Sequence, residues 1–373
     1  MDLKQLRDNI DDIDSRILSL FLQRMQVCRD VAEYKSINNL PVFQGGREEQ
    51  VINRIKQLTN DVNLENGTAA LFTTIMDISK HLQNQSILSC TQDYEFNVPD
   101  FASAQSIGCQ GTMGANSEAA ARLIFGNKPL KFFHSFEDVF CAVENGDIEY
   151  GVLPIHNSTA GSVTTTYDLM AQHSVYIVKT VCVEINHCLA SKSDISADEI
   201  SCVYSHPQAL AQCSDFIAAH GLKTKDYSNT ATAAEFVKNS SVEEKLAAVC
   251  SRECAESLGL HIISDKISDC SVNRTKFICI SRNLQVMDDA DTISVMLKIP
   301  HTHGSLYRLL TKFYVNGMNL IKLESRPVKD GSFEVMFYLD FSGKVTDRNV
   351  KVLLTDLNNS LEYFKFLGTS KDT

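Results

Sequence analysis

The stretch YGVLPIHNSTAGSV at residues 150–163 decides the fold of the middle of the chain. Its apolar half, YGVLPI, runs into a polar turn that carries Asn157, Ser158 and Thr159. A short apolar run bounded by turn residues predicts a buried strand with polar side chains at its carboxyl end.

The same pattern recurs on both sides of this stretch. Further strands are expected at 106–111, 175–185, 202–206, 247–251 and 276–280, and helices at 117–125, 135–143, 207–220, 230–239 and 252–260. This alternation predicts an α/β domain with mostly parallel sheets over residues 105–283. The aperiodic residues 91–104 are expected to be a linker.

The two flanking segments follow other patterns. In residues 1–90, apolar residues spaced by three and four predict a long helix to about Ile37, then helices at 47–58 and 68–89. Three helices cover little apolar surface, so we expect this segment to pair with a second copy. Residues 290–373 show a βαββαβ order, which predicts an α+β ferredoxin-like domain.

Composition excludes several classes of protein. The chain has 373 residues, of which 44% are hydrophobic, and its net charge is −11, which disfavours disorder and a nonspecific nucleic-acid surface. No apolar run is long enough to span a membrane. The twelve cysteines form no CxxC motif and follow no signal sequence, so we expect a cytoplasmic protein with reduced cysteines and neither metal nor cofactor.

The first segment carries cations at helical spacing. Arg24 and Lys35 are 11 residues apart, which places them about 20° from the same face and ~16 Å apart along the helix. Arg7 lies ~25 Å from Arg24 along the helix, so it reaches a shared ligand only from a partner subunit. Ser79 and Gln83 are i, i+4 neighbours on one face. The alternative is that these cations are ordinary solvated surface residues.

The opening LRDNIDDIDSRILSLFLQRMQVCRDVAEYK (6–35), followed by Pro41-Val42 and Arg47-Glu48, resembles the all-helical chorismate mutase family. The resemblance implies rearrangement of chorismate to prephenate by gripping a dicarboxylate and stabilising charge on the breaking ether oxygen. It assigns roles to the following residues: Arg7 from the partner and Arg24 on the carboxylates, Lys35 and Gln83 on the ether oxygen, and Arg47, Glu48 and Ser79 on the carboxylates and ring hydroxyl.

One departure from this family affects the expected efficiency. Gln44 stands where many members carry an aspartate that contacts the ring hydroxyl. We expect reduced or altered mutase activity rather than its absence. The alternative is that the helical segment serves mainly for dimerisation.

Four strand-to-helix junctions of the middle segment concentrate small polar residues: GCQGTMGANSEAA (108–120), PIHNSTAGSV (154–163), SHPQAL (205–210) and NRTKF (273–277). Polar residues at strand ends, opposite helix N-termini, suit a small carboxylate. Gly108, Gly111 and Gly114 do not form GxGxxG, which disfavours a nucleotide site. His206 is either a general base or a helix cap.

Together the four junctions resemble prephenate dehydratase, which implies a two-lobed, periplasmic-binding-protein-like α/β fold. The implied reaction removes carbon dioxide and the ring hydroxyl from prephenate and gives phenylpyruvate. Thr275 would assist departure of hydroxide within the catalytic run Thr275, Lys276 and Phe277. The implied substrate-positioning residues are Gly114, Ser117, Asn157, Ser158, Thr159, Ser205, His206 and Gln208.

Two positions of the middle segment depart from the dehydratase pattern. Lys276 stands where Arg is usual, and His156 where Glu is usual; the second change is expected to shift the pH optimum. These departures leave open a carboxylate- or amino-acid-sensing binding protein with a degenerate catalytic domain.

The final segment contains Glu324, Ser325, Arg326 and Pro327, the ESRP motif, and it resembles the ACT domain. The resemblance implies an L-phenylalanine pocket between paired copies, in a homodimer or homotetramer, and feedback inhibition. The partner motif, usually GALV, here comprises Gly304, Ser305, Leu306 and Tyr307, and the tyrosine is expected to alter the pocket or its affinity. The alternative is an ordinary strand end with Arg326 as a surface charge.

Overall fold

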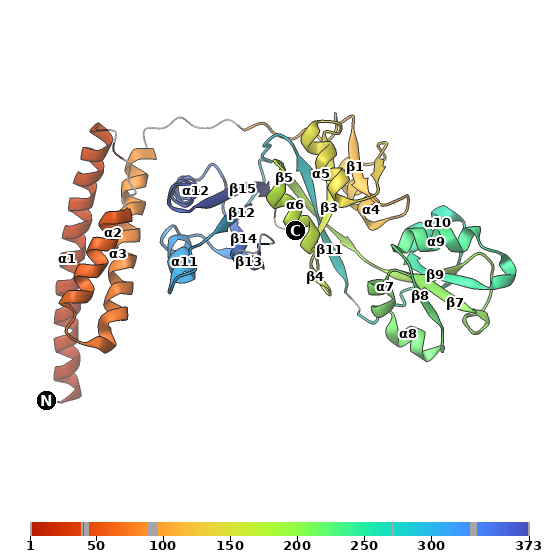
Figure 1. Cartoon of the computed structure of the whole chain (residues 1–373), viewed down its shortest axis with the longest axis horizontal. Coiled ribbons are helices and arrows are strands. Elements are labelled where there is room, and N and C mark those ends of the chain that lie inside the picture. Colours follow the sequence, from red (N-terminus) through yellow and green to blue (C-terminus); the bar gives the residue numbers. More distant parts are fainter. Residues whose placement is uncertain are drawn as a thin grey trace. The chain divides into compact units, whose positions relative to one another are not determined.

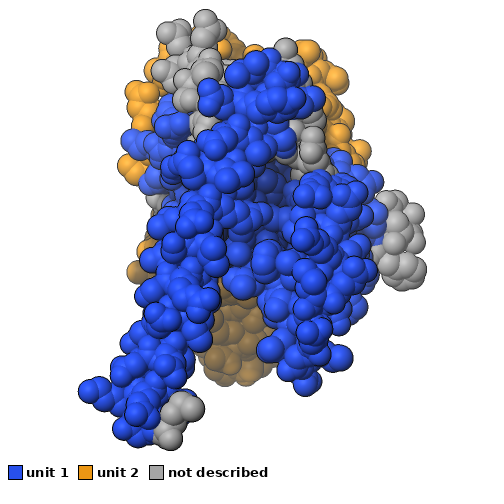
Figure 2. All heavy atoms as spheres, turned by 90° about the vertical axis from the view of Figure 1, so that its left-hand side faces the viewer, with its two compact units in different colours: residues 1–95, 291–366 blue, residues 96–290, 367–373 orange. Residues whose placement is uncertain are grey.

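The computed structural model describes residues 2–38, 40, 45–88, 96–270, 272–328 and 334–371. The chain divides into two compact units, coloured separately in Figure 2. Unit 1 comprises Met1–Glu95 and Asp291–Phe366, and unit 2 comprises Phe96–Ala290 and Leu367–Thr373. The helical segment and the C-terminal segment therefore belong to one unit, although they lie at opposite ends of the sequence.

Unit 1 begins with three helices, α1 (Leu3–Ile37), α2 (Gly45–Leu58) and α3 (Val62–Leu88) (Figure 1). A capping box starts α1, because the Asp2 carboxylate accepts from the backbone N–H of Gln5 at 2.8 Å. The expected three helices are confirmed. However, α3 begins six residues before the expected Thr68, because the Asp61 carboxylate accepts from the Asn63 N–H and Gly67 is tolerated within the helix.

One face of α1 is exposed in the part of the chain that the structure describes. The exposed fractions of Leu3, Ile10, Leu20 and Val27 lie between 56% and 65%. An amphipathic helix of this length with its apolar face in water is typical of a segment that associates with another chain.

The C-terminal part of unit 1 has the expected βαββαβ order. Its elements are β12 (Thr292–Lys298), α11 (Ser305–Val315), β13 (Leu320–Pro327), β14 (Val335–Ser342), α12 (Arg348–Ser360) and β15 (Tyr363–Ser370). The sheet order is β13-β14-β12-β15, that of the ferredoxin-like arrangement, and Leu309, Phe313 and Phe341 lie in its core. Helices α11 and α12 pack against α3 of the helical segment.

Unit 2 consists of two lobes, each built on its own sheet. The first lobe contains β1 (Ile107–Gln110), α4 (Asn116–Phe125), β2 (Lys131–Phe133), α5 (Phe136–Asn145), β3 (Tyr150–Asn157), β4 (Gly161–Ser162), α6 (Thr164–Gln172), β5 (Tyr176–Glu184) and β11 (Arg274–Ser281). The second contains β6 (His187–Ser191), β7 (Cys202–Ser205), α7 (Pro207–Ala211), α8 (Ser214–Ala219), β8 (Thr224–Asp226), α9 (Thr230–Asn239), β9 (Leu246–Ser251), α10 (Arg252–Leu258) and β10 (His261–Ser264). Two short 3-10 helices, Ala197–Glu199 and Val242–Glu244, complete it.

The expectation of mostly parallel sheets is wrong. In the first lobe the order is β5-β11-β3-β1-β2, and β11 pairs antiparallel with both β5 and β3. In the second lobe the order is β10-β6-β9-β7-β8; β6 pairs antiparallel with both β10 and β9, while β7 pairs parallel with β9 and β8. The reason is that the chain crosses between the lobes directly from β5 into β6 and from β10 back into β11, without a crossover helix.

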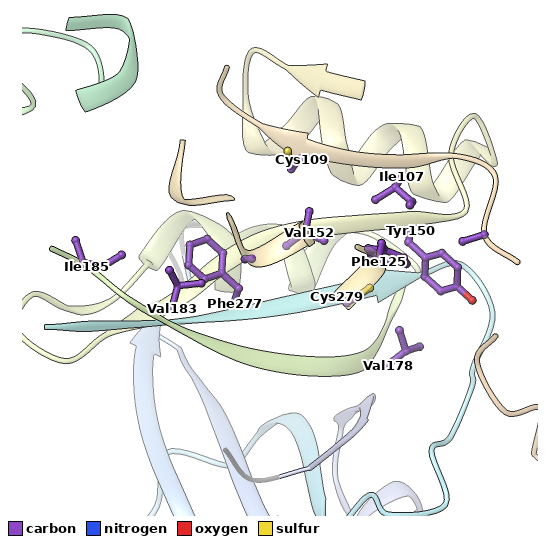
Figure 3. Packing of buried hydrophobic residues seen from close by; sticks show 13 residues of the cluster. Ile107, Cys109, Phe125, Tyr150, Val152, Val178, Val183, Ile185, Phe277 and Cys279 are labelled. Atoms are coloured by element: carbon purple, nitrogen blue, oxygen red, sulfur yellow. The ribbon is translucent and has the colours of Figure 1, made fainter. Parts of the chain in front are cut away.

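The core of the first lobe fixes strand β11 in place. Phe277 and Cys279 point into a buried cluster with Val152, Val178 and Val183 (Figure 3). Residues two apart on a strand face the same side of the sheet, so this anchoring also directs Thr275, at the start of β11, toward that side.

Candidate active sites

The first candidate site lies among α1, α2 and α3. Arg24 of α1 donates from Nη1 to the Ser79 hydroxyl of α3 at 2.5 Å. Ser79 is 4% exposed and donates in turn to the Ile75 carbonyl at 2.7 Å. The buried hydroxyl therefore holds the guanidinium of Arg24 where α1 packs against α3.

Lys35 and Glu48 add opposite charges to this site. Burial lowers the pKa of Lys35, while the carboxylate of Glu48 and the thiol of Cys28 act in the opposite direction. Glu48 on α2 also accepts from the ammonium of Lys80 at 3.2 Å. A partly buried anion thus stands close to two ammonium groups.

The other residues predicted for this site have different surroundings. Gln83 is buried, and its Oε1 has no hydrogen-bond partner among the described residues. Arg47 and Arg7 are both exposed, and Arg47 donates to Gln50 at 3.5 Å. Gln44 and the Pro41-Val42 turn lie outside the described residues.

The second candidate site is a cavity of about 400 Å³ in unit 2, lined from both lobes. Six residues expected from the sequence lie on its wall: Ser117, Asn157, His206, Gln208, Thr275 and Phe277. The N-terminus of α4 also borders it and has no side-chain cap, so the backbone N–H groups of its first turn favour an anion there. The cavity suits a small carboxylate.

A hydrogen bond orients the hydroxyl of Thr275. This residue is 8% exposed and is the cross-strand partner of Asn157, whose Nδ2 donates to Thr275 Oγ1 at 2.9 Å. Because the oxygen already accepts a hydrogen bond, the hydroxyl proton of Thr275 remains to be donated elsewhere. The residue is therefore set up as a donor.

The amide of Asn157 is itself held from several directions. Its Oδ1 accepts from the backbone N–H of Thr159 at 3.0 Å, from the Thr159 hydroxyl at 2.7 Å and from the Ala160 N–H at 2.8 Å. With three donors on its oxygen, the side-chain nitrogen faces the acceptors of β11 and the residue before it: Asn273 Oδ1, Thr275 Oγ1 and, at 3.4 Å, the Arg274 carbonyl. Thr159 thus supports Asn157 and does not itself line the cavity.

Three further residues belong to the same network: Asn273, which lies in the expected NRTKF junction but was given no role, and Gln212 and His187, which were not anticipated. Asn157 donates to Asn273 Oδ1 at 2.8 Å, and Asn273 donates to Gln212 Oε1 at 3.1 Å. His187 Nε2 donates to the same Gln212 oxygen at 3.1 Å. Asn273 precedes Thr275 by two residues and Gln212 follows Gln208 by four, so strand and helix periodicity could have suggested both. A lone histidine in a strand gives no such signal.

His187 is an unusual member of this wall. It is 4% exposed, and burial lowers its pKa, although the contact with Gln212 opposes that shift. Because Nε2 donates to an amide oxygen, Nδ1 carries the free lone pair, and it has no partner within the described part of the chain. The neutral imidazole therefore presents a buried acceptor.

Three expected residues, Ser205, Ser158 and Gly114, lie outside this cavity, whereas His206 lines it and also caps a helix. Ser205 is fully buried and donates to the Val249 carbonyl at 2.6 Å, and Ser158 accepts from the Arg274 N–H at 2.9 Å. Gly114 has φ +84°, and an added Cβ would meet Cys254 at 2.8 Å. His206 caps α7 by accepting from the Gln208 N–H at 3.2 Å, as one of its two interpretations predicted.

The two departures from the dehydratase pattern are neighbours in the structure. Lys276 on β11 and His156 on β3 are direct cross-strand partners, and His156 Nδ1 lies 3.4 Å from the Ser162 hydroxyl. Neither residue lines the cavity that holds Thr275. The usual Arg and Glu at these two positions would form one pair, so the two substitutions change a single contact beside the site.

The third candidate site is a cavity of about 370 Å³ in the C-terminal segment of unit 1. Ser305, Leu306 and Ser325 lie on its wall, and Gly304 caps α11 with φ +77°. Glu324 instead pairs with Lys322 at 3.1 Å and lies 4.0 Å from Arg326. The remaining ESRP residue, Pro327, ends β13.

Tyr307 lies apart from the residues that line this cavity. Its hydroxyl lies 3.2 Å from that of Thr74 on α3, so the side chain is directed toward the helical segment. The prediction that the tyrosine alters the pocket or its affinity concerns a pocket between paired copies, and it stays a prediction.

Three general findings concern the described residues as a whole. They contain no group of three or more His, Cys, Asp or Glu side chains placed to hold a metal ion. None of the helices they form is both long and apolar enough to cross a membrane. The eleven cysteines for which the structure gives a position are free thiols.

Comparison with known proteins assigns two segments of the chain to enzyme families. The family model described as Chorismate mutase type II matches residues 6–84, and the model described as Prephenate dehydratase matches residues 107–285. The bifunctional chorismate mutase/prephenate dehydratase of Stutzerimonas stutzeri is 30% identical over 98% of this chain and 97% of its own length. The chain belongs to this bifunctional family. It is an enzyme with a chorismate mutase segment and a prephenate dehydratase segment.

Other relatives share the dehydratase part of the bifunctional enzyme. The chloroplastic arogenate dehydratase/prephenate dehydratase 1 of Arabidopsis thaliana is 34% identical over 70% of this chain and 71% of its own. A solved prephenate dehydratase in complex with L-Phe, from Arthrobacter aurescens, covers 72% of this chain and 90% of its own, with a TM-score of 0.66 and 26% identity.

Proposed function

We propose that the site formed by Arg24, Lys35, Glu48 and Ser79 binds chorismate and rearranges it to prephenate. The Arg24–Ser79 contact supports this, because it fixes a guanidinium at the joint of two helices where a carboxylate can bind it bidentately. Lys35, and Gln83 through its amide, would stabilise charge on the breaking ether oxygen. The reaction needs neither metal nor cofactor, since preorganised donors suffice for a pericyclic step.

The mutase site is completed in this proposal by a second copy of the chain. Arg7 lies about 25 Å along α1 from Arg24 and is exposed, so it can serve only a site in a partner subunit. The uncovered apolar face of α1 supplies a surface for such pairing. The enzyme would therefore be at least a homodimer.

The cavity of unit 2 is proposed to bind prephenate and convert it to phenylpyruvate. Cleavage of the ring–carboxylate bond releases carbon dioxide, and its electron pair aromatises the ring as the C–OH bond breaks. The leaving hydroxide takes a proton and departs as water. The hydrogen bond from Asn157 to Thr275 carries this assignment, because it leaves the threonine proton directed to the cavity.

L-phenylalanine is proposed to bind the cavity that Ser305, Leu306 and Ser325 line. The ESRP sequence, the ferredoxin-like topology and the relative solved with L-Phe support this assignment to an ACT domain. Binding would lower dehydratase activity through differential affinity for two arrangements of the chain. The enzyme would thus work in cytoplasmic phenylalanine biosynthesis under feedback control.

One experiment tests the whole proposal. Purified protein is given chorismate, and both prephenate and phenylpyruvate are followed with and without L-phenylalanine. The expected result is transient prephenate, then phenylpyruvate, with slower phenylpyruvate formation when phenylalanine is present. Formation of neither product would refute the catalytic assignments, and indifference to millimolar phenylalanine together with no calorimetric binding would refute the regulatory one.

A further inference from the structure

A buried lysine next to the mutase site has no role in the reaction described so far. Lys80 follows Ser79 on α3 and is 8% exposed. Its ammonium lies 3.2 Å from Glu48 Oε2 and 2.8 Å from Asp77 Oδ1. Lysine is rarely buried in proteins without a partner, and here two carboxylates from two helices share one ammonium.

The position of the Glu48 carboxylate depends on its contact with Lys80. Glu48 projects from α2, which packs alongside α3 in unit 1 (Figure 1), and its side chain is 30% exposed. Asp77 is the more buried of the two carboxylates, with a side chain that is 6% exposed, so it binds the ammonium on the buried side. Of the three paired residues, Asp77, Lys80 and Glu48, only Glu48 is exposed enough to reach a substrate.

We propose that Lys80 is a positioning residue of the mutase reaction, which holds the Glu48 carboxylate in place to accept a hydrogen bond from the ring hydroxyl of chorismate. This inference rests on the role proposed above for Glu48. Lys80 itself acts through Glu48 and does not touch the substrate.

Charged groups on three helices face Lys80. Asp77 faces Lys80 from α3 and Glu48 from α2, and Asp356 acts on it from α12. Burial opposes the charge of Lys80, but the carboxylates outweigh burial and raise its pKa. Arg308 and Lys312 of α11 line the same cavity of about 550 Å³, and Lys312 is itself paired with Asp356. Lys80 is therefore an ammonium throughout the working pH range.

The test compares three variants for mutase kcat/KM. Lys80→Met should lower kcat/KM about tenfold or more, because a charge-assisted hydrogen bond is lost. Lys80→Arg keeps the charge and should recover most of the activity. Lys56→Met is the matched control: Lys56 lies on α2 in an exposed pair 4.0 Å from Glu65, and its loss should leave mutase activity unchanged. The dehydratase activity of each variant, measured in the same preparation, reports on whether unit 2 is folded.

Two further measurements separate positioning from mere packing. The acid limb of the pH profile of kcat/KM should move to higher pH in Lys80→Met, because a carboxylate that has lost its cation protonates more readily. In a Glu48→Gln background, Lys80→Met should cost less than about twofold, because the residue through which it acts is already gone.

The outcomes distinguish the two proposals. An active Glu48→Gln enzyme would overturn the role of Glu48 itself. An impaired Glu48→Gln enzyme beside a fully active Lys80→Met enzyme would overturn only the inference about Lys80. Equal losses from Lys80→Met in both backgrounds, with an unshifted pH profile, would also overturn it, because they would show that the lysine does not act through Glu48.

Discussion

Replacing Thr275 by valine removes one hydroxyl from the dehydratase cavity and leaves the shape of the side chain nearly unchanged. Asn157 Nδ2 loses an acceptor at 2.9 Å but keeps Asn273 Oδ1 at 2.8 Å. The fold should therefore lose only about 1 kcal/mol, which lowers the melting temperature by roughly 2–4 °C. The reaction, by contrast, loses its proposed proton donor, and general acid catalysis contributes about 100- to 10,000-fold.

The assay gives prephenate to the purified Thr275→Val enzyme and measures phenylpyruvate by its ultraviolet absorbance in alkali. We expect kcat to fall at least ~100-fold, with Thr275→Ser retaining most activity because serine keeps the hydroxyl. Unchanged mutase activity in the same preparation shows that the protein is present and active. If Thr275→Val keeps kcat within about threefold of the original enzyme, the hydroxyl is not the donor.

Three further predictions concern unit 2. The fold lowers the pKa of His187, so the free energy of unfolding that its neutral imidazole contributes is fully present above the ordinary pKa of 6.5 and is lost as pH falls through the lowered pKa. His187→Gln should therefore make the protein lose less stability on acidification, which melting temperatures near pH 7 and pH 5 measure. The double change His156→Glu with Lys276→Arg should alter dehydratase kcat less than about threefold at neutral pH, since neither side chain lines the cavity; a larger change in steady-state kinetics would show that the pair acts on the substrate. Gly114→Ala should lower the melting temperature, because its Cβ would meet Cys254 at 2.8 Å and φ is +84°; an unchanged melting curve would contradict the packing.

Helical and strand elements could largely be predicted from the sequence because their apolar spacing records which face is buried. The long helix α1 ends at Ile37, as its periodicity indicated. Strand direction could not be predicted in the same way. An apolar run such as the one in β11 looks the same whether its neighbours are parallel or antiparallel, so only the two crossings between the lobes determine the mixed sheets.

The candidate sites were predictable to the extent that their residues belong to motifs. Thr275 and Asn157 were expected separately, and the register of β11 on β3 makes them partners. Gln212 and His187 belong to no motif and reach the site only because two lobes close around it. Similarly, nothing in the spacing of Tyr307 indicates a contact with Thr74, which is 233 residues away.

Local rather than overall charge explains how a chain with a net charge of −11 can bind anionic substrates. In the mutase segment the ammonium of Lys80 is taken up by Asp77 and Glu48, whereas Arg24 contacts only neutral partners in its described hydrogen bonds, a serine hydroxyl and a cysteine thiol. A cation held by neutral groups keeps its full charge for a carboxylate, while a cation held by two anions can only orient them. The same helices thus use one basic residue for binding and another for positioning, and counting charges along the sequence does not separate the two.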